Sequence, residues 1–345
     1  MKKLTLLLFL ALISFTPSYL FSEPSYPTNY AVIEKETNRL LYGSNENVRR
    51  LTASIAKIMT LTVALTYGNL SDIVTVGDEI NQAVGSKIYI EVGMKIPLKD
   101  LLYGLMLESG NDASLTIAKH IGGSLEGFVY LMNEMAKQIG MKNSTFENPS
   151  GLDEDTENYS TPYDMAILTS YASKLDHFYE IAGAKSYVSK SEKTLYFNHK
   201  HRLIKTNKMF IAGKTGYTKR AGRTLVSVAK KDNMEVIIVT FNDPSDWNHH
   251  TYLADLAFSQ YNNKLVLKKQ VIASNAYLNQ NVYIPIRENE LSEVSSEVFL
   301  YEKPINGITG YLIIYLKGYE IARYNLKSIK DKETNGLISF VEKYL

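Results

Sequence analysis

Cysteine is absent from all 345 residues of the chain. This absence excludes disulfide bonds, and it also excludes lipid attachment through a cysteine behind a leader peptide. The sequence has no run of basic residues and no cluster of zinc ligands, so no feature of it indicates nucleic-acid binding. Stability must therefore come from the apolar core, and an apolar content of 45% is ample for one large and one small domain.

Long apolar runs are also lacking, apart from one at the N-terminus. It begins with Met1-Lys2-Lys3 and continues through the apolar segment 4–15, which is too short for a stable membrane span. We expect a secretory signal peptide over residues 1–22, cleaved after Ser18 or Ser22, and a protein exported to the periplasm or the outer face of the cytoplasmic membrane. Cleavage lowers the count of Lys and Arg from 38 to 36, equal to the 36 acids, so the mature protein is formally neutral.

Histidine is scarce, with six residues in the chain. Two pairs, His199 with His201 and His249 with His250, could bind a metal ion. We favour exposed or locally hydrogen-bonded side chains at these positions. We expect neither a metal nor an organic cofactor.

The sequence does contain the pattern Ser-x-x-Lys, and it contains it twice. A chain of this composition holds the pattern about once by chance, so neither copy carries weight alone. Ser227-Val228-Ala229-Lys230 lies in a β-branched run typical of a strand, where positions three apart point to opposite faces, and we reject it. Ser54-Ile55-Ala56-Lys57 opens a run of helical length and composition, residues 55–65, so its serine and lysine share one face a turn apart.

A serine and a lysine that share a helix face can act as a nucleophile and its base. A lysine amine is normally protonated, but burial beside other cations lowers its pKa toward ~7–8, where it can accept the serine proton. Lys214 could supply such a field for Lys57, and the helix N-terminus at Ser54 adds a positive dipole end. The alternative is that Ser54 is an ordinary helix cap.

A second string, Ser109-Gly110-Asn111, lies between helical patterns at 98–107 and 112–121. The spacing predicts an interhelical loop. Such a loop can present the Ser109 hydroxyl as a proton relay and the Asn111 amide as donor and acceptor toward a peptide bond. The alternative is a plain loop with an asparagine cap for the next helix.

A third string, Lys214-Thr215-Gly216, lies in a strand-turn-strand pattern that continues into the strand at Thr224. A lysine and a threonine hydroxyl on a strand edge can pair with a carboxylate. Gly216 lets a substrate backbone approach closely, because it has no Cβ. The alternative is a hairpin edge kept soluble by lysine.

The three strings in this order carry a family resemblance that no single string supports. The chain resembles the penicillin-binding D-alanyl-D-alanine carboxypeptidases, which are low-molecular-mass penicillin-binding proteins with a serine nucleophile. The likeness covers most of residues 30–260 and includes 51–53, 57–60, 109–113, 148–153, 159–166, 213–218, 221–222 and 246–250. It implies an α/β (α+β) fold of the penicillin-binding and β-lactamase type, with an antiparallel sheet flanked by helices and a small all-β C-terminal domain.

The resemblance also implies roles for individual residues. Ser54 would be the acylated nucleophile, Lys57 its base, and Ser109 with Asn111 the relay and amide-binding pair. Lys214 and Thr215 would anchor the substrate's terminal carboxylate beside Gly216. The oxyanion hole would use the backbone N–H groups of Ser54 and Tyr217.

The chain departs from the family pattern in two places. Many relatives have His where Ser150 stands, and some carry a further carboxylate-binding Arg where this chain reads Asp246-Trp247-Asn248-His249-His250. Arg220 and Arg223 are weak candidates for that missing cation. We favour a plain surface role for both.

The implied activity is removal of the terminal D-alanine from peptidoglycan stem peptides through an acyl-enzyme, with β-lactams as covalent inhibitors. A class A β-lactamase has the same three strings but needs a Glu-x-x-Leu-Asn element for deacylation. The segment nearest to it, Glu192-Lys193-Thr194-Leu195-Tyr196, matches poorly in residue and position. An endopeptidase that cuts cross-links and a non-catalytic wall-binding protein are also compatible with the three strings.

Four regions are expected along the chain. The signal peptide at 1–22 is followed by a catalytic domain at 27–262, a β-sandwich-like domain at 263–335 and a short amphipathic tail at 336–345. The β prediction rests on short aromatic and β-branched segments at 265–267, 281–286, 298–301 and 310–316. The tail could make peripheral membrane contact, or it could pack on the β domain.

Overall fold

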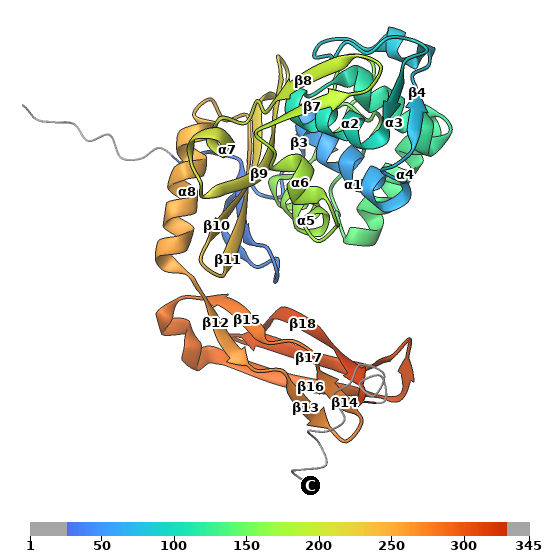
Figure 1. Cartoon of the computed structure of the whole chain (residues 1–345). Coiled ribbons are helices and arrows are strands. Elements are labelled where there is room, and N and C mark those ends of the chain that lie inside the picture. Colours follow the sequence, from blue (N-terminus) through green and yellow to red (C-terminus); the bar gives the residue numbers. More distant parts are fainter. Residues whose placement is uncertain (1–25, 330–345) are drawn as a thin grey trace, which may run out of the picture.

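The computed structural model describes residues 26–329, so the predicted signal peptide and the predicted tail lie outside the described residues. Figure 1 shows two parts, a sheet flanked by helices and, beyond the last helix, a region made of strands. Within residues 26–329, none of the helices has the length and apolar character needed to cross a membrane.

A five-stranded antiparallel sheet forms the centre of the first part. Its strands lie in the order β2 (Leu40–Ser44), β1 (Tyr30–Glu34), β11 (Met234–Phe241), β10 (Gly222–Lys231) and β9 (Phe210–Thr218). Side chains alternate between its faces, so Ile237 and Val239 join one apolar core and Val236 and Ile238 join another. Since both faces are covered, the central strand β11 is β-branched and buried almost throughout.

Helices cover the two faces of this sheet. One face carries α8 (Asp246–Gln260), and the larger helical layer lies on the other. That layer contains α1 (Lys57–Tyr67), α2 (Leu98–Tyr103), α3 (Asn111–Gly122), α4 (Leu125–Ile139), α5 (Pro162–Ala172) and α6 (Phe178–Ala182), with a π-helical turn, η3 (Gly104–Glu108), after α2. The short elements η1 (Ala53–Ala56), η2 (Asp78–Gln82) and α7 (Arg202–Thr206) complete the helices of this part.

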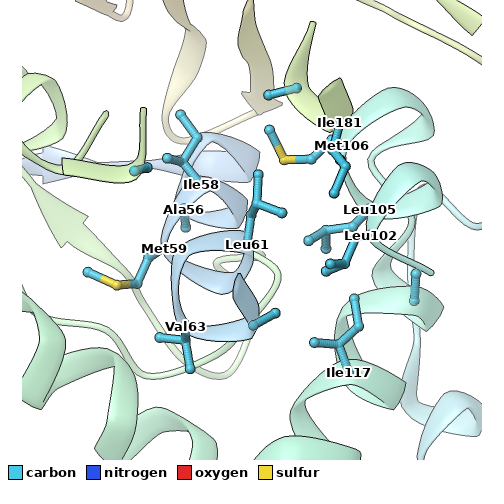
Figure 2. Close-up of a cluster of buried hydrophobic side chains, with 14 of the residues drawn as sticks. Ala56, Ile58, Met59, Leu61, Val63, Leu102, Leu105, Met106, Ile117 and Ile181 are labelled. Atoms are coloured by element: carbon cyan, nitrogen blue, oxygen red, sulfur yellow. The ribbon is translucent and has the colours of Figure 1, made fainter. Parts of the chain in front are cut away.

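Helix α1 lies at the centre of the larger core, where its side chains face those of η3, α3 and α6 (Figure 2). Its residues from Lys57 to Ala64 are all buried. A helix that is apolar on every side must be enclosed by other elements. Because the apolar residues of α1 are buried on every side, its one lysine, Lys57, is buried with them.

Three two-stranded ribbons surround the helical layer: β3 (Arg50–Leu51) with β6 (Tyr159–Ser160), β4 (Ile73–Thr75) with β5 (Lys95–Pro97), and β7 (Ser186–Lys190) with β8 (Thr194–Asn198). The first lies next to η1 in the sequence. Its pairing joins the segment before η1 to the segment before α5.

The C-terminal part is built from strands, as the sequence predicts. β12 (Asn262–Leu267) pairs with β15 (Val282–Ile286), and a second sheet has the order β13 (Gln270–Ala273), β14 (Ala276–Leu278), β18 (Tyr319–Ser328), β17 (Ile308–Leu316) and β16 (Val294–Ile305), with the short helix η4 (Glu288–Glu293) before β16. The strands of this part enclose an apolar cluster that is separate from the two cores of the first part. Arg39 of the first part pairs with Glu290 at 2.9 Å. The division at residues 262 and 263 stays a prediction.

Candidate active site

Ser54 and Lys57 lie where η1 runs into α1. The sequence predicts an α-helix from Ile55, but the first turn is a 3-10 helix and α1 begins at Lys57. The backbone N–H of Lys57 bonds the Ser54 carbonyl, which closes that tighter turn. The two side chains still lie one turn apart, and Lys57 Nζ is 3.1 Å from Ser54 Oγ.

Lys57 has partners that leave its amine free to act on Ser54. Its Nζ is 2.7 Å from Asn111 Oδ1 and 2.6 Å from the Ser150 carbonyl oxygen, and both of these atoms can only accept hydrogen bonds. A neutral amine has two N–H donors and one lone pair. With both donors used on the two oxygens, the lone pair is left to accept the Ser54 proton.

The pKa of Lys57 is lowered well below its ordinary value, first by complete burial and then by the nearby charges of Lys214 and Lys200. Burial also lowers the pKa of Lys214 to about 7, with Lys200 as the second cause. The field expected from Lys214 is therefore present. Sequence reasoning missed Lys200, because its position before α7 gives no sign that it comes near Lys57.

Ser109 and Asn111 are brought to the same place by α2, η3 and α3. Ser109 follows η3 with a left-handed φ of 63°, and it lines an open cavity next to Ser54, the catalytic cavity. Asn111 is the first residue of α3, so the predicted loop consists of Ser109 and Gly110 alone. The Asn111 side chain donates from Nδ2 to the Val84 carbonyl while its Oδ1 accepts from Lys57.

The third string lies on β9, which is an edge strand of the sheet, as predicted. Thr215, Gly216 and Tyr217 line the cavity, but Lys214 is 1% exposed and donates from Nζ to the Thr215 carbonyl at 2.7 Å. A Cβ on Gly216 would lie 2.9 Å from the Ser54 nitrogen, so only glycine lets β9 pass this close to η1.

The catalytic cavity is an open space of about 330 Å³ between these elements. Its wall includes the predicted residues Ser54, Ser109, Thr215, Gly216 and Tyr217. Arg223, one of the two weak candidates for the missing cation, also lines it. So do four residues that the sequence did not single out as site residues: Ser86, Lys200, Asp246 and Trp247. Arg223 lies at this wall because β10 brings its start to the edge of the cavity, and its role there stays a prediction.

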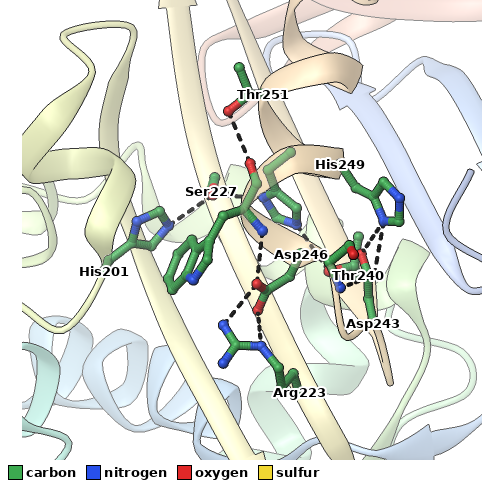
Figure 3. A network of polar contacts seen from close by, with 11 residues as sticks. His201, Arg223, Ser227, Thr240, Asp243, Asp246, His249 and Thr251 are labelled. Atoms are coloured by element: carbon green, nitrogen blue, oxygen red, sulfur yellow. Dashed lines mark hydrogen bonds and ion pairs between the residues drawn. The ribbon is translucent and has the colours of Figure 1, made fainter. Parts of the chain in front are cut away.

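Arg223 is held in place by two neighbours from the start of α8. Its Nε and Nη2 donate to the two oxygens of Asp246 at 3.1 and 2.8 Å (Figure 3). Its guanidinium lies 5.4 Å from the centre of the Trp247 ring. A bidentate pair and a stacked ring fix the plane of the guanidinium. Arg220 instead bonds the Asp153 carbonyl and pairs with Glu157, away from the cavity wall.

The rejected serine, Ser227, lies in a buried histidine network next to β9. Its Oγ is 2.8 Å from His201 Nε2 and 2.7 Å from His250 Nδ1, and His250 Nε2 reaches Thr240 Oγ1 at 3.1 Å (Figure 3). Burial lowers the pKa of His250 to about 3 and that of His201 well below its ordinary value. The expected local hydrogen bonds of these histidines are confirmed, although His201 and His250 are buried.

No cluster of three or more metal-ligating side chains occurs in the part of the chain that the structure describes. The site instead combines a serine hydroxyl, a buried lysine with a lowered pKa and an edge strand of an antiparallel sheet. This fold and this site define a serine peptidase of the penicillin-binding class.

Comparisons with known proteins name the family within this class. Residues 23–245 match the family model described as D-alanyl-D-alanine carboxypeptidase. The chain is 32% identical to D-alanyl-D-alanine carboxypeptidase DacF of Bacillus subtilis, over 99% of this chain and 98% of that relative. It is 28% identical to D-alanyl-D-alanine carboxypeptidase DacA of Haemophilus influenzae, over 89% and 86%. The chain therefore belongs to the D-alanyl-D-alanine carboxypeptidase family.

A solved structure agrees with the family and the fold class. Penicillin binding protein 5 from Haemophilus influenzae is similar with a TM-score of 0.73 and 26% identity, and the match covers 89% of this chain and 98% of that protein. The predicted fold class and the resemblance stated from the motifs are confirmed.

Proposed function

We propose that this protein is a serine D-Ala-D-Ala carboxypeptidase that removes the terminal D-alanine from peptidoglycan stem peptides and is acylated by β-lactams. The observation that carries this proposal is the contact of Lys57 Nζ with Ser54 Oγ, with the two N–H donors of the amine engaged elsewhere. An uncharged lysine in this position removes the serine proton as the hydroxyl attacks.

In the first step, Ser54 Oγ attacks the carbonyl carbon of the scissile peptide bond while Lys57 takes the hydroxyl proton. The backbone N–H groups of Ser54 and Tyr217 hold the oxyanion. The C–N bond then breaks, and the proton returns from Lys57, with Ser109 as relay, to the departing amine of D-alanine. A water molecule later hydrolyses the Ser54 ester by the same steps and restores the serine.

The substrate's terminal carboxylate is assigned to Thr215 and Arg223. Thr215 lines the cavity from β9. Arg223 lines it next to the start of α8, where Asp246 holds its guanidinium. Asp246 uses two of the five guanidinium N–H donors, so donors remain for a carboxylate. Lys214 does not contact the carboxylate, because its side chain is buried and does not line the cavity. Its charge instead lowers the pKa of Lys57.

A β-lactam should stay attached to Ser54. The poor match to a deacylating glutamate, Glu192, accepts a hydrogen bond from the Lys95 backbone and does not line the cavity. Among the described residues that line it, the acid is Asp246, which is paired with Arg223. A carboxylate free to activate water is thus missing from that wall, and we infer an enzyme that penicillin inhibits.

The test uses purified protein and two serine variants with opposite expected results. Fluorescent penicillin should label the wild type and Ser227→Ala covalently, and it should not label Ser54→Ala. Wild type should release D-alanine from a diacyl-L-lysyl-D-Ala-D-Ala peptide, and Ser54→Ala should lose this activity by about 10⁴-fold or more. Label on Ser54→Ala, or rapid release of penicilloate from wild type, would overturn the proposal.

A further inference from the structure

A buried carboxylate, that of Asp112, lies next to the catalytic residues and is held by backbone N–H groups. Asp112 is the second residue of α3 and is 2% exposed. Its Oδ1 accepts from the Ala113 N–H at 2.9 Å and its Oδ2 from the Tyr89 N–H at 2.8 Å, while the Ile88 nitrogen lies 3.0 Å from both oxygens. A buried carboxylate is costly unless hydrogen bonds compensate for lost hydration. These contacts therefore fix the carboxylate and the N–H groups together.

The segment that Asp112 holds, residues 84–89, has neither helix nor strand to fix its shape. Tyr89 has a left-handed φ of 60°, which costs a residue other than glycine about 1–3 kcal/mol and persists only where the surroundings impose it. The Tyr89 side chain is exposed, whereas that of Ile88 is buried. The hydrogen bonds to Asp112 and the burial of Ile88 thus hold this segment in place.

The same segment contacts the partner of the catalytic lysine. The Ser86 carbonyl accepts from the Asn111 N–H at 2.7 Å, and the Val84 carbonyl accepts from Asn111 Nδ2. Asn111 Oδ1 in turn accepts from Lys57 Nζ at 2.7 Å. Ser86 also lines the catalytic cavity. A displacement of this segment would therefore move both a wall of the cavity and the acceptor that orients the base.

We propose that Asp112 is a positioning residue for acylation: it fixes the segment 84–89, and this segment holds Asn111 against the catalytic lysine. The inference rests on the proposed function, because it takes Lys57 as the base that acts on Ser54. Asp112 does not line the catalytic cavity and acts only through these neighbours.

A purely local role for Asp112 explains one of its contacts and not the others. An acid in the first turn of a helix stabilises that helix, and the bond from Ala113 belongs to this role. The bonds from Ile88 and Tyr89 come from residues 24 and 23 positions earlier in the chain. They add nothing to the turn of α3, but they join it to the wall of the active site.

The charge of Asp112 acts on the base in a direction that the experiment can separate from positioning. Burial and the charges of Lys214 and Lys200 lower the pKa of Lys57, whereas the charge of Asp112 raises it. Loss of the charge alone should let Lys57 lose its proton at a lower pH and leave the maximal rate unchanged. Loss of position should lower the maximal rate.

The experiment measures acylation by penicillin across pH in wild type and Asp112→Asn. Asparagine keeps one acceptor oxygen and replaces the other with an NH₂ group, so a backbone N–H loses its acceptor. The rate at the high-pH plateau should fall by about 10- to 100-fold, as for other small displacements in a preorganised site. The amides of Ile88 and Tyr89 should exchange their hydrogens with solvent about tenfold faster.

The matched control is Asp164→Asn. Asp164 is also 2% exposed and lies in the first turn of a helix, α5. It accepts from the Asn143 N–H and the Ser144 hydroxyl, both at 2.7 Å, and none of the three residues lines the catalytic cavity. This variant should lose stability and keep the wild-type plateau, because the segment that it loosens lies away from the site.

A wild-type plateau in Asp112→Asn, reached at lower pH, would overturn the inference, as would an equal loss of rate in Asp164→Asn or unchanged exchange at Tyr89. Wild type gives a check that needs no variant to fold: the Ile88 and Tyr89 amides should be protected, and fast exchange at both would overturn the inference. Each of these results leaves the proposed function standing as long as penicillin acylates wild type. Failure of that acylation would reject both.

Discussion

Ser54 and Ser227 begin two segments with the same Ser-x-x-Lys pattern, yet their surroundings are opposite. Ser54 is half-buried at a cavity wall, and its lysine touches it at 3.1 Å. Ser227 is fully buried between two histidines, and Lys230 is exposed and pairs with Glu235 at 2.9 Å. A helical turn places positions three apart on one face, whereas a strand separates them. The backbone conformation therefore decides which copy can form a nucleophile and its base.

The two lysines differ as much as the two serines. Lys57 lies in a helix that is buried on every side, so its ammonium form is disfavoured. Lys230 lies near the end of β10 at the surface, where solvent stabilises its charge. The apolar packing around α1 thus lowers the pKa of Lys57 so that it can act as a base. The four-residue pattern itself does not contain this effect.

The largest expected effect separates these lysines. Lys57→Met should slow acylation by penicillin by about 10²- to 10⁴-fold, because the serine then has no base. Lys230→Met should leave the rate unchanged within twofold, since an exposed ion pair contributes little. Stopped-flow acylation measures both. Equal loss in the two variants would contradict the distinction between the segments.

The pH dependence of the same reaction sharpens this result. Because the pKa of Lys57 lies well below its ordinary value of 10.5, wild-type acylation should rise with pH and level off well before that value. Below the lowered pKa the amine carries a proton and cannot accept another. A rate that rises only above pH 10 would show that Lys57 is an ordinary lysine.

A smaller effect is expected at Arg223, which lies on the same strand as Ser227, β10. Arg223→Lys keeps the charge but cannot make the paired contacts of a guanidinium, so KM for the peptide should rise by about tenfold. The increase should disappear when the terminal D-alanine is amidated, because no carboxylate is left to bind. Arg220→Lys is the control and should leave KM unchanged. An increase that persists with the amidated peptide would remove Arg223 from carboxylate binding.

The smallest effect on activity, and a clear effect on stability, is expected in the histidine network. His250 has a folded pKa of about 3 against 6.5 in the unfolded chain, so the unfolded state binds more protons between these values. Stability should therefore fall as the pH falls from 6.5, and His250 contributes about 3 kcal/mol of this loss by pH 4. Urea unfolding of wild type and His250→Gln measures it. The variant should show a shallower dependence on pH, and identical slopes would refute the assignment.

Several elements of the fold follow from local patterns. The β-branched run after Thr224, the helical periods around Ser109 and the short aromatic strands beyond residue 262 all form as predicted. These succeed because side-chain period and turn residues act within a few positions. The 3-10 turn at Ser54 is not predicted, because residue composition does not distinguish its tighter hydrogen bond from that of an α-helix.

The sequence alone determined the family, the order of the three strings and the choice of Ser54 over Ser227, because these depend on residue type and local period. Only the tertiary structure decided that Lys214 is buried, that Arg223 reaches the cavity and that Lys200 adds to the field on Lys57. Charge and burial at a point depend on segments far apart in the chain, and packing alone brings those segments together.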